Sequence, residues 1–224
     1  MAAKARGKFI TIEGLDGCGK STQLGKLAAV LRARGIEVVL TREPGGTPAG
    51  ESIRAVLLDS RTTGLAPMAE LALMFASRAQ HLHEVILPAL AAGRFILCDR
   101  FTDSTEAYQG GGRKVGVEPV HQLHHLLCGG IQPDLTLLMD SEVSASVARA
   151  RRRNTAAASG PHDENRFEQE SRAFFERVRN GYLAIAKREP ERVVLLDARR
   201  PVEIVHGEIV EAVCTRLLRT AKTT

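Results

Sequence analysis

Phe9-Ile-Thr-Ile-Glu-Gly14-Leu-Asp-Gly-Cys-Gly19-Lys20-Ser21-Thr22 joins a short β-branched apolar run to the pattern G-x-x-x-x-G-K-S and then to a helical pattern. In a strand, loop and helix setting this pattern predicts a P-loop, whose backbone N–H groups surround a phosphate at the positive end of the helix. Lys20 can reach the β- and γ-phosphates, and the Ser21 hydroxyl can hold Mg²⁺. The expected phosphate-binding residues are Gly14, Leu15, Asp16, Gly17, Cys18, Gly19, Lys20, Ser21 and Thr22.

Length and composition limit the class of protein. With 224 residues, 44% of them hydrophobic, the chain can bury one full core, so we expect a single domain over residues 1–224. No apolar run approaches the roughly 20 residues that a membrane-spanning helix needs. We therefore expect a cytoplasmic protein with no membrane partner. The four cysteines contain no C-x-x-C pair, which argues against a disulfide framework.

The formal net charge of +5 suits nucleic acids, but it suits small polyanions such as nucleotides equally well. The basic residues gather at Arg149, Arg151, Arg152 and Arg153 rather than in long stripes. Only 4% of the residues are aromatic, which is a poor composition for stacking single strands. The pattern therefore favours a nucleotide ligand and no nucleic-acid partner.

Strand-like and helical patterns alternate along the chain, which is typical of an α/β fold with a parallel sheet. Five strands are expected at Phe9–Glu13, 37–41, 94–99, Leu135–Asp140 and Val193–Asp197. Helices are expected at Lys20–Ala33, 49–59, 67–92, 103–109, Val117–Cys128, 142–153, 166–189 and 201–219. Together with the P-loop this predicts a P-loop NTPase fold, with a five-stranded parallel sheet flanked by helices on both faces.

Ligands of such a sheet bind at the carboxyl ends of the strands, so the residues that follow each strand are informative. Arg42 and a Gly-rich turn follow the second expected strand, and the arginine can bind a second phosphate. Asp99 and Arg100 follow the third strand, where the carboxylate can reach Mg²⁺ and the arginine an acceptor phosphate. The alternatives are a surface pair of Arg42 with Glu43 and a structural ion pair of Asp99 with Arg100.

A segment of small and polar residues, 154–164, lies between two expected helices and follows the arginine cluster. Beside a P-loop it predicts a mobile lid over about residues 149–166, because phosphoryl transfer needs positive charge over the γ-phosphate and exclusion of water. The alternative is an exposed loop after a solvated basic helix end.

These motifs, taken in order, resemble the thymidylate kinases, a family of P-loop nucleoside monophosphate kinases. The resemblance rests on Glu13-Gly-Leu-Asp-Gly-Cys-Gly-Lys-Ser21, Arg42-Glu-Pro-Gly-Gly-Thr47, Asp99-Arg-Phe101, Ser104-Thr-Glu-Ala-Tyr-Gln-Gly110 and Pro133-Asp-Leu-Thr-Leu-Leu-Met-Asp140. It implies transfer of the ATP γ-phosphoryl group to dTMP, giving dTDP and ADP, in dTTP synthesis. It also implies Mg²⁺ as a cofactor and a homodimer.

The resemblance further implies roles for single residues. Phe75 is expected to stack on thymine, Arg78 to bind a base carbonyl, and Tyr108 to lie against the sugar. The other expected substrate-binding residues are Thr105 and Gln109 at the base edge, Asp16 near the sugar 3′-hydroxyl or the acceptor phosphate, and Arg42 and Arg100 at the acceptor phosphate. The expected metal-binding residues are Ser21 and Asp99.

The family supplies a catalytic cation either from the P-loop or from the lid. The variable P-loop positions here, Leu15 to Cys18, contain no basic residue, so the chain resembles the bacterial type with lid arginines. The expected catalytic residues are Lys20, Arg100, Arg151 and Arg153, with Arg153 favoured over Arg151 as the lid cation and Arg166 as a further candidate.

Other interpretations compete with these. His121, His124, His125 and Cys128 follow a helical spacing that could hold zinc, although a packing face or subunit contact fits them better. Cys18 could be a redox switch or simply a small side chain. The chain could phosphorylate another nucleotide or a deoxynucleoside, but two arginines favour a monophosphate acceptor. It could also be a nucleotide-dependent switch that hydrolyses ATP slowly.

Overall fold

A computed structural model describes residues 5–157 and 164–218, and its centre is a five-stranded sheet. All neighbouring strands are parallel, in the order β2-β3-β1-β4-β5. The strands are β1 (Phe9–Glu13), β2 (Val38–Arg42), β3 (Phe95–Asp99), β4 (Leu135–Asp140) and β5 (Val193–Asp197). The α/β fold with a five-stranded parallel sheet is confirmed, and the expected strands differ from these by one residue at most at each end.

Helices connect the strands. Before β4 they are α1 (Lys20–Ala33), α2 (Pro48–Leu58), α3 (Pro67–His81), the π-helical turn η1 (Leu82–Ile86), α4 (Leu87–Ala91), α5 (Thr102–Thr105), the π-helical turn η2 (Glu106–Gly112) and α6 (Val117–Cys128). After β4 they are α7 (Val143–Ala157), α8 (Arg172–Arg188), α9 (Val202–Val213) and the π-helical turn η3 (Cys214–Leu218). In the described residues no helix is long and apolar enough to cross a membrane.

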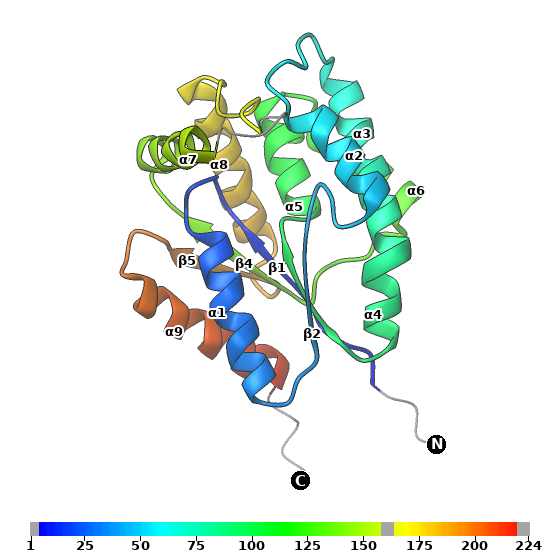
Figure 1. Ribbon diagram of the computed structural model, residues 1–224, viewed down its shortest axis with the longest axis vertical. Coiled ribbons are helices and arrows are strands. Elements are labelled where there is room, and N and C mark those ends of the chain that lie inside the picture. Colours follow the sequence, from blue (N-terminus) through cyan, green and yellow to red (C-terminus); the bar gives the residue numbers. More distant parts are fainter. Residues whose placement is uncertain (1–4, 158–163, 219–224) are drawn as a thin grey trace.

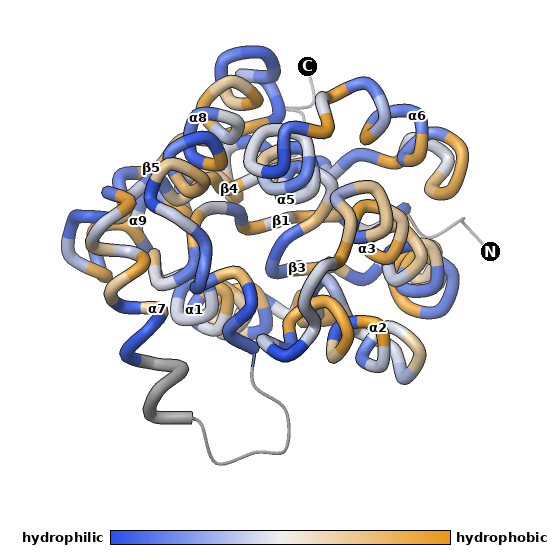
Figure 2. Tube along the Cα trace, turned by 90° about the horizontal axis from the view of Figure 1, so that it is seen from above, coloured by the Kyte–Doolittle hydropathy of each residue, from blue (hydrophilic) through white to orange (hydrophobic). Residues whose placement is uncertain are grey.

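The helices cover both faces of the sheet (Figures 1 and 2). Ile10 and Ile12 of β1 pack with α1 and α9 on one face, whereas Phe9 packs with α3, α4 and α6 on the other. A third cluster joins α8 and η2 to the same second face. Successive side chains of β1 point to opposite faces of the sheet, and helices cover both faces. An apolar run such as β1 is therefore buried on both sides.

The helix expected at 142–153 runs to Ala157, so the first residues of the segment 154–164, expected to be a loop, are helical, and the helix expected at 67–92 contains the π-helical turn η1. Two further expected helices differ from the structure for local reasons. The expected helix 166–189 begins only at Arg172, because Ser171 caps it by accepting a hydrogen bond from Phe174 N at 3.2 Å. The preceding turn packs on α2, where Arg166 N donates to Leu58 O at 3.0 Å. The expected helix 103–109 continues to Gly112 as a π-helical turn, a feature often found at functional sites.

The strand order places the P-loop at the centre of the carboxyl edge of the sheet. β1 lies between β3 and β4, so the segments that follow β1 and β3 leave the sheet side by side. This explains why residues after strands far apart in the sequence meet in one place.

Candidate active site

The loop between β1 and α1 has the backbone of a phosphate-binding P-loop. Gly14, Gly17 and Gly19 have φ angles of 133°, 79° and 102°, which side-chain-bearing residues rarely adopt. A Cβ atom at Gly17 would lie 2.4 Å from Ser146 O, so the packing of the loop on α7 also requires glycine. Helix α1 starts directly after the loop, at Lys20, and its N-terminus favours a bound anion.

Lys20 is buried and held over the loop. Its Nζ donates to Gly14 O at 3.2 Å and to Leu15 O at 3.0 Å, and it lies 3.7 Å from Asp16 Oδ1. A buried ammonium held by carbonyl groups at the mouth of an anion site can transfer its hydrogen bonds to a bound phosphate. The structure therefore places Lys20 where the motif predicts it.

Ser21 and Asp99 form the candidate Mg²⁺ site. Ser21 Oγ donates to Asp99 Oδ2 at 3.3 Å, whereas Asp99 Oδ1 is buried with no hydrogen-bond partner among the described residues. An unpartnered carboxylate oxygen beside a hydroxyl is the oxygen donor set that Mg²⁺ prefers. The residues present fit the ion that the P-loop implies.

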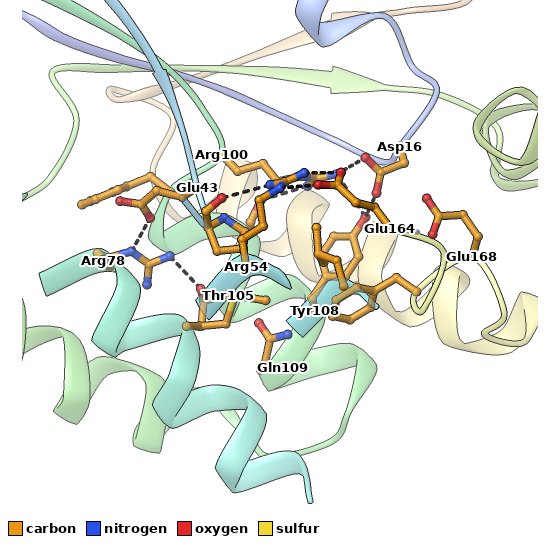
Figure 3. A pocket seen from close by; sticks show the side chains of 16 residues that line it. Asp16, Glu43, Arg54, Arg78, Arg100, Thr105, Tyr108, Gln109, Glu164 and Glu168 are labelled. Atoms are coloured by element: carbon orange, nitrogen blue, oxygen red, sulfur yellow. Dashed lines mark hydrogen bonds and ion pairs between the residues drawn. The ribbon is translucent and has the colours of Figure 1, made fainter. Parts of the chain in front are cut away.

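Two cavities open at this edge of the sheet, and they are called the donor cavity and the acceptor cavity after the ligands that the sequence predicts for them. The donor cavity has a volume of about 1360 Å³, part of it open to solvent, and is lined by Asp16, Gly17, Gly19, Lys20, Ser21, Thr22, Arg42, Glu43, Arg54, Asp99, Arg100, Arg149 and Glu164. The acceptor cavity, of about 720 Å³, is lined by Asp16, Glu43, Pro44, Arg54, Leu58, Met74, Arg78, Arg100, Phe101, Ser104, Thr105, Tyr108, Gln109, Glu164, Phe167 and Glu168 (Figure 3).

Arg100 lies in the wall between the two cavities and is held on several sides. Its backbone is left-handed, with φ 72°, which turns the chain sharply after β3. Nη2 donates to Asp16 Oδ1 at 2.9 Å, and Nη1 donates to Tyr182 OH at 2.9 Å and Ser104 Oγ at 3.0 Å. The guanidinium carbon lies 5.0 Å from the ring centre of Tyr108. The guanidinium is therefore held in a defined orientation between the cavities, and a phosphate bound there would take over a donor that now faces Asp16.

Glu13, at the end of β1, contacts two residues that bind the Arg100 guanidinium, Ser104 and Tyr182. It is fully buried and accepts hydrogen bonds from Phe101 N at 2.7 Å, Ser104 Oγ at 2.5 Å and Tyr182 OH at 3.2 Å. Burial, together with the charge of Asp103, raises the pKa of Glu13 to about 8. This pKa favours the protonated carboxyl at neutral pH, in which Glu13 donates one of its two hydrogen bonds with the Ser104 and Tyr182 hydroxyls instead of accepting it.

The raised pKa of Glu13 predicts a pH-dependent contribution to stability. Between the ordinary pKa of 4.5 and about 8 the folded state binds more protons than the unfolded chain, so the free energy of unfolding falls as pH rises. Glu13→Gln cannot ionise. Its stability relative to the unmodified protein is expected to rise with pH, at a rate on the order of 1 kcal/mol per pH unit within this window. Urea unfolding at pH 5, 7 and 9 measures this, and a constant difference would contradict it.

Arg78 is buried and lies against the acceptor cavity. Its Nε donates to Glu43 Oε2 at 2.7 Å and its Nη2 donates to Thr105 Oγ1 at 2.9 Å (Figure 3). The guanidinium is sandwiched between Phe75 and Phe101, 4.9 and 5.0 Å from their ring centres. Nη1 has no hydrogen-bond partner among the described residues. Arg78 thus keeps one buried donor for a ligand, as the prediction for a base carbonyl requires.

The expected stacking of Phe75 on the base does not fit this geometry. Phe75 is 0% exposed, belongs to the core cluster of α3, α4 and α6, and does not line the acceptor cavity. The preceding residue, Met74, does line it. Successive helix residues point about 100° apart, so a shift of one residue turns a cavity residue into a core residue. Phe75 therefore supports Arg78 from behind the cavity.

Tyr108 and Gln109 come from the π-helical turn η2, and both line the acceptor cavity, as does Thr105. The Tyr108 hydroxyl lies 3.3 Å from Arg100 Nη2 and donates to Asp16 Oδ2 at 3.4 Å. Gln109 is buried, and its Nε2 donates to Glu70 Oε1 at 2.8 Å. The structure brings these expected substrate residues together around one cavity.

Arg42 lies in the donor cavity but does not line the acceptor cavity. It is the last residue of β2, an edge strand, and its side chain is 53% exposed, with Nη2 donating to Glu51 Oε2 at 3.0 Å. Its assignment to the acceptor phosphate stays a prediction.

The lid arginines are placed differently from one another. Arg149 lines the donor cavity, and its Nε donates to Gly17 O at 2.8 Å. Arg151, expected to be catalytic, instead donates from Nε and Nη2 to Glu168 O at 3.1 and 2.8 Å and lines neither cavity. The side chain of Arg153 lies outside the described part of the chain. Arg149 is therefore the lid arginine that the structure places at the donor cavity.

Arg54 and Glu164 are site residues that no sequence motif indicates. Both line both cavities, and Arg54 Nε and Nη2 donate to the two carboxylate oxygens of Glu164 at 2.8 and 2.7 Å. Arg54 Nη1 also donates to Pro44 O at 2.9 Å. The pair joins α2 to the C-terminal end of the expected lid, at a wall that both cavities share.

The alternative roles of histidine and cysteine receive no support. Within residues 5–157 and 164–218 no group of three or more histidine, cysteine or acidic side chains could hold a metal ion. His124 is buried and bonded to Thr102, whereas His121 is bonded to Glu106. Cys18 is buried, and burial raises the pKa of its thiol, which disfavours the reactive thiolate.

Comparison with known proteins agrees with this geometry. A family model described as Thymidylate kinase matches residues 12–209. The thymidylate kinase of Trichlorobacter lovleyi is 54% identical over 209 residues, covering 93% of this chain and 98% of that protein. That of Pseudomonas putida (strain GB-1) is 53% identical over 203 residues, covering 91% and 93%.

A solved structure is similar over nearly the same range. The crystal structure of thymidylate kinase from Ehrlichia chaffeensis has a TM-score of 0.74 at 32% identity, covering 93% of this chain and 99% of that chain. A P-loop cavity that shares a wall with a second cavity is also what a monophosphate kinase needs. The chain therefore belongs to the thymidylate kinase family, enzymes that phosphorylate dTMP to dTDP with ATP as donor.

Proposed function

We propose that ATP binds in the donor cavity, that dTMP binds in the acceptor cavity, and that the phosphoryl group crosses the wall between them. The observation that carries this proposal is the shared lining. Both cavities are lined by Asp16, Glu43, Arg54, Arg100 and Glu164. Two arginines in a wall that both ligands would touch can neutralise the donor and acceptor phosphates at the point where they meet.

The proposed mechanism needs little covalent chemistry from the protein. The acceptor phosphate is already a nucleophile, so positioning and charge neutralisation supply most of the rate. Lys20 would bind the donor phosphates, and Arg100 would orient the acceptor. Ser21 and Asp99 would hold Mg²⁺, which supplies charge neutralisation at the β- and γ-phosphates when bound. The unpartnered Oδ1 of Asp99 supports that assignment.

Base recognition would use a donor and an acceptor that face the same cavity. Arg78 Nη1 would donate to a carbonyl of the pyrimidine, and the Gln109 amide oxygen would accept from the neighbouring ring N–H. Met74, one turn before Arg78, would pack on the ring in place of the expected Phe75. The polarizable thioether of methionine can contact an aromatic ring favourably.

A panel of acceptors tests the proposed division of the site. ADP formation should depend on added monophosphate, and dTMP should be a far better acceptor than thymidine, which lacks the phosphate that Arg100 would bind. Steady-state transfer from ATP to dTMP, dUMP, the ribonucleotide TMP and thymidine measures this. Comparable turnover with thymidine, or ADP release without any acceptor, would overturn the assignment.

The proposed lid covers about residues 149–166, of which 158–163 lie outside the described part of the chain, and it supplies the cation that the variable P-loop positions Leu15 to Cys18 lack. Support comes from Arg149 at the donor cavity and from Glu164 on Arg54, which lie on the two sides of the lid. Position 153 lies one helical turn beyond Arg149 in α7, whereas position 151 falls on a different face. We therefore propose Arg149 and Arg153 as the catalytic lid arginines.

Single substitutions test the lid arginines. Arg149→Ala and Arg153→Ala should each lower turnover by about 10³-fold, with a much smaller change in dTMP affinity, because the lost charge acts on the transferred group. Arg151→Ala is the matched control, since Arg151 binds the Glu168 carbonyl and should affect mainly stability. Measured kcat and KM distinguish these cases, and an unchanged turnover would remove the substituted arginine from the catalytic role.

We also propose a single catalytic domain, a cytoplasmic location and a homodimer. Helix α6 supports the dimer, because Leu126 is 76% exposed beside the half-exposed Leu127, an apolar surface that a second copy could cover. Leu126→Glu should shift the protein from dimer to monomer in light scattering. A mass that is already monomeric in the unmodified protein would contradict the dimer.

A further inference from the structure

Glu70 is a completely buried carboxylate in the first turn of α3. Oε1 accepts hydrogen bonds from Gln109 Nε2 at 2.8 Å and from Arg113 Nε at 3.0 Å. Oε2 lies 3.1 Å from Arg113 Nε and 2.7 Å from Arg166 Nη2. Two guanidinium groups offset the cost of burying this carboxylate. Neither sequence motifs nor the mechanism above gives Glu70 a role, although it lies directly behind a residue of the acceptor cavity.

The carboxylate determines which way the Gln109 amide faces. A glutamine amide has two nearly isosteric orientations, with NH₂ or C=O toward a given neighbour. A carboxylate can only accept, so it selects the orientation in which NH₂ points toward Glu70. The oxygen then points elsewhere, and Figure 3 shows it on the side of Thr105. Glu70 thus converts an ambiguous amide into a fixed hydrogen-bond acceptor.

Arg78 is fixed in the same manner by another buried acidic residue, Glu43. Its Nε is used by Glu43 and its Nη2 by Thr105, which leaves Nη1 as the unpartnered donor. Arg78 and Gln109 both line the cavity, so a base bound there would meet an arginine donor and an amide acceptor. This pair matches a pyrimidine edge with a carbonyl beside a ring N–H, as in thymine and uracil. The corresponding edge of cytosine has donor and acceptor exchanged, so both contacts would be repulsive.

We propose that Glu70 is a positioning residue that sets base selectivity, by holding the Gln109 amide in the orientation that rejects amino-pyrimidines. The proposal rests on the proposed function, in which Gln109 meets the base. It goes beyond that function by assigning the choice between oxo- and amino-pyrimidines to a residue that does not line the cavity.

Glu70→Gln tests this assignment with minimal change in volume. Arg113 and Arg166 require an acceptor, so the oxygen of the new amide faces them and its NH₂ faces Gln109. Gln109 must then turn its own oxygen toward position 70 and its NH₂ toward the cavity. The ratio of kcat/KM for dTMP over dCMP should fall by about ten- to hundredfold. The turned amide would donate a hydrogen bond to N3 of cytosine and would face the N3–H group of thymine with a second donor.

Two controls separate positioning from structural support. The dTMP to dUMP ratio should stay unchanged in Glu70→Gln, because these bases present the same edge and differ only at C5. Arg113→Met weakens the buried ion pairs but leaves the carboxylate facing Gln109, so it should lower the melting temperature and leave the dTMP to dCMP ratio intact. Each ratio is measured on one protein sample, so a loss of folded enzyme cancels.

The outcomes distinguish this inference from the proposed function. Gln109→Leu should lower kcat/KM for dTMP, and no change there would refute Gln109 as a base contact. If Gln109→Leu behaves as expected but Glu70→Gln keeps its selectivity, only the role of Glu70 is overturned. An equal loss of selectivity in Arg113→Met would also overturn it. If Glu70→Gln does not fold, the double variant Glu70→Gln/Arg113→Met, which also removes one buried guanidinium, must show the same fall in ratio.

Discussion

Lys20→Met is expected to lower kcat by about 10³-fold, because it removes the only side-chain cation within the P-loop itself. Lys20 is buried, and its Nζ is held by the carbonyl groups of Gly14 and Leu15, so its charge lies at a fixed position beside the P-loop. Methionine keeps most of the aliphatic side chain, which limits the change to the charge and its hydrogen bonds. Steady-state kinetics at saturating ATP and dTMP measure the loss.

Lys26→Met is the matched control for this substitution. Lys26 lies on the same helix, but its side chain is more exposed and pairs with Glu203 at 2.8 Å, away from both cavities. Its removal should leave kcat unchanged. A Lys20→Met enzyme with more than about a tenth of normal turnover would show that other groups carry the donor phosphates.

Arg100→Met is the second substitution with a large expected effect, a fall in kcat/KM for dTMP of about 10²-fold or more. The guanidinium donates to Asp16, Ser104, Tyr108 and Tyr182, so its loss leaves these polar groups without their donor and would also remove the proposed phosphate contact. The KM for dTMP should rise more than the KM for ATP, because Arg100 would contact the acceptor.

Arg100→Lys separates charge from geometry. Lysine keeps the positive charge but cannot reproduce the planar fork that contacts Asp16 on one side and Tyr182 on the other. We expect its kcat/KM for dTMP to lie between those of the unmodified enzyme and Arg100→Met. Equal activity of Arg100→Lys and the unmodified enzyme would show that the fixed orientation of the guanidinium is unimportant.

The fold and the donor site follow from local sequence patterns. Apolar runs of five or six residues, each ended by a polar residue, predict the strands, and the spacing of Gly14, Gly19 and Lys20 predicts the loop that joins β1 to α1. Such patterns are local because backbone geometry and helix polarity act over a few residues. The P-loop residues are therefore predicted where the structure has them, whereas Arg54 and Glu164, which also line the donor cavity, are not predicted.

The acceptor site depends on contacts between distant parts of the chain, which sequence patterns capture less well. Met74 rather than Phe75 lines the cavity because the rotation of α3 is set by its packing on α6 and the sheet, not by its own sequence. Arg54 has no motif because its partner, Glu164, lies beyond α7. From the sequence, Glu70 is an ordinary acidic residue in the first turn of a helix. Its burial follows from tertiary contacts that the local sequence does not predict.

The strand order has a consequence for local unfolding. β1 and β3 each pair with strands on both sides, whereas β2 and β5 each pair with one described strand. Edge strands open at lower free energy than central strands, so amide hydrogens should exchange fastest in β2 and β5 and slowest in β1 and β3. Lys20, Asp99 and Arg100 would then stay in place while an edge frays. Arg42, at the end of β2, would be the first arginine of the donor cavity that transient opening displaces.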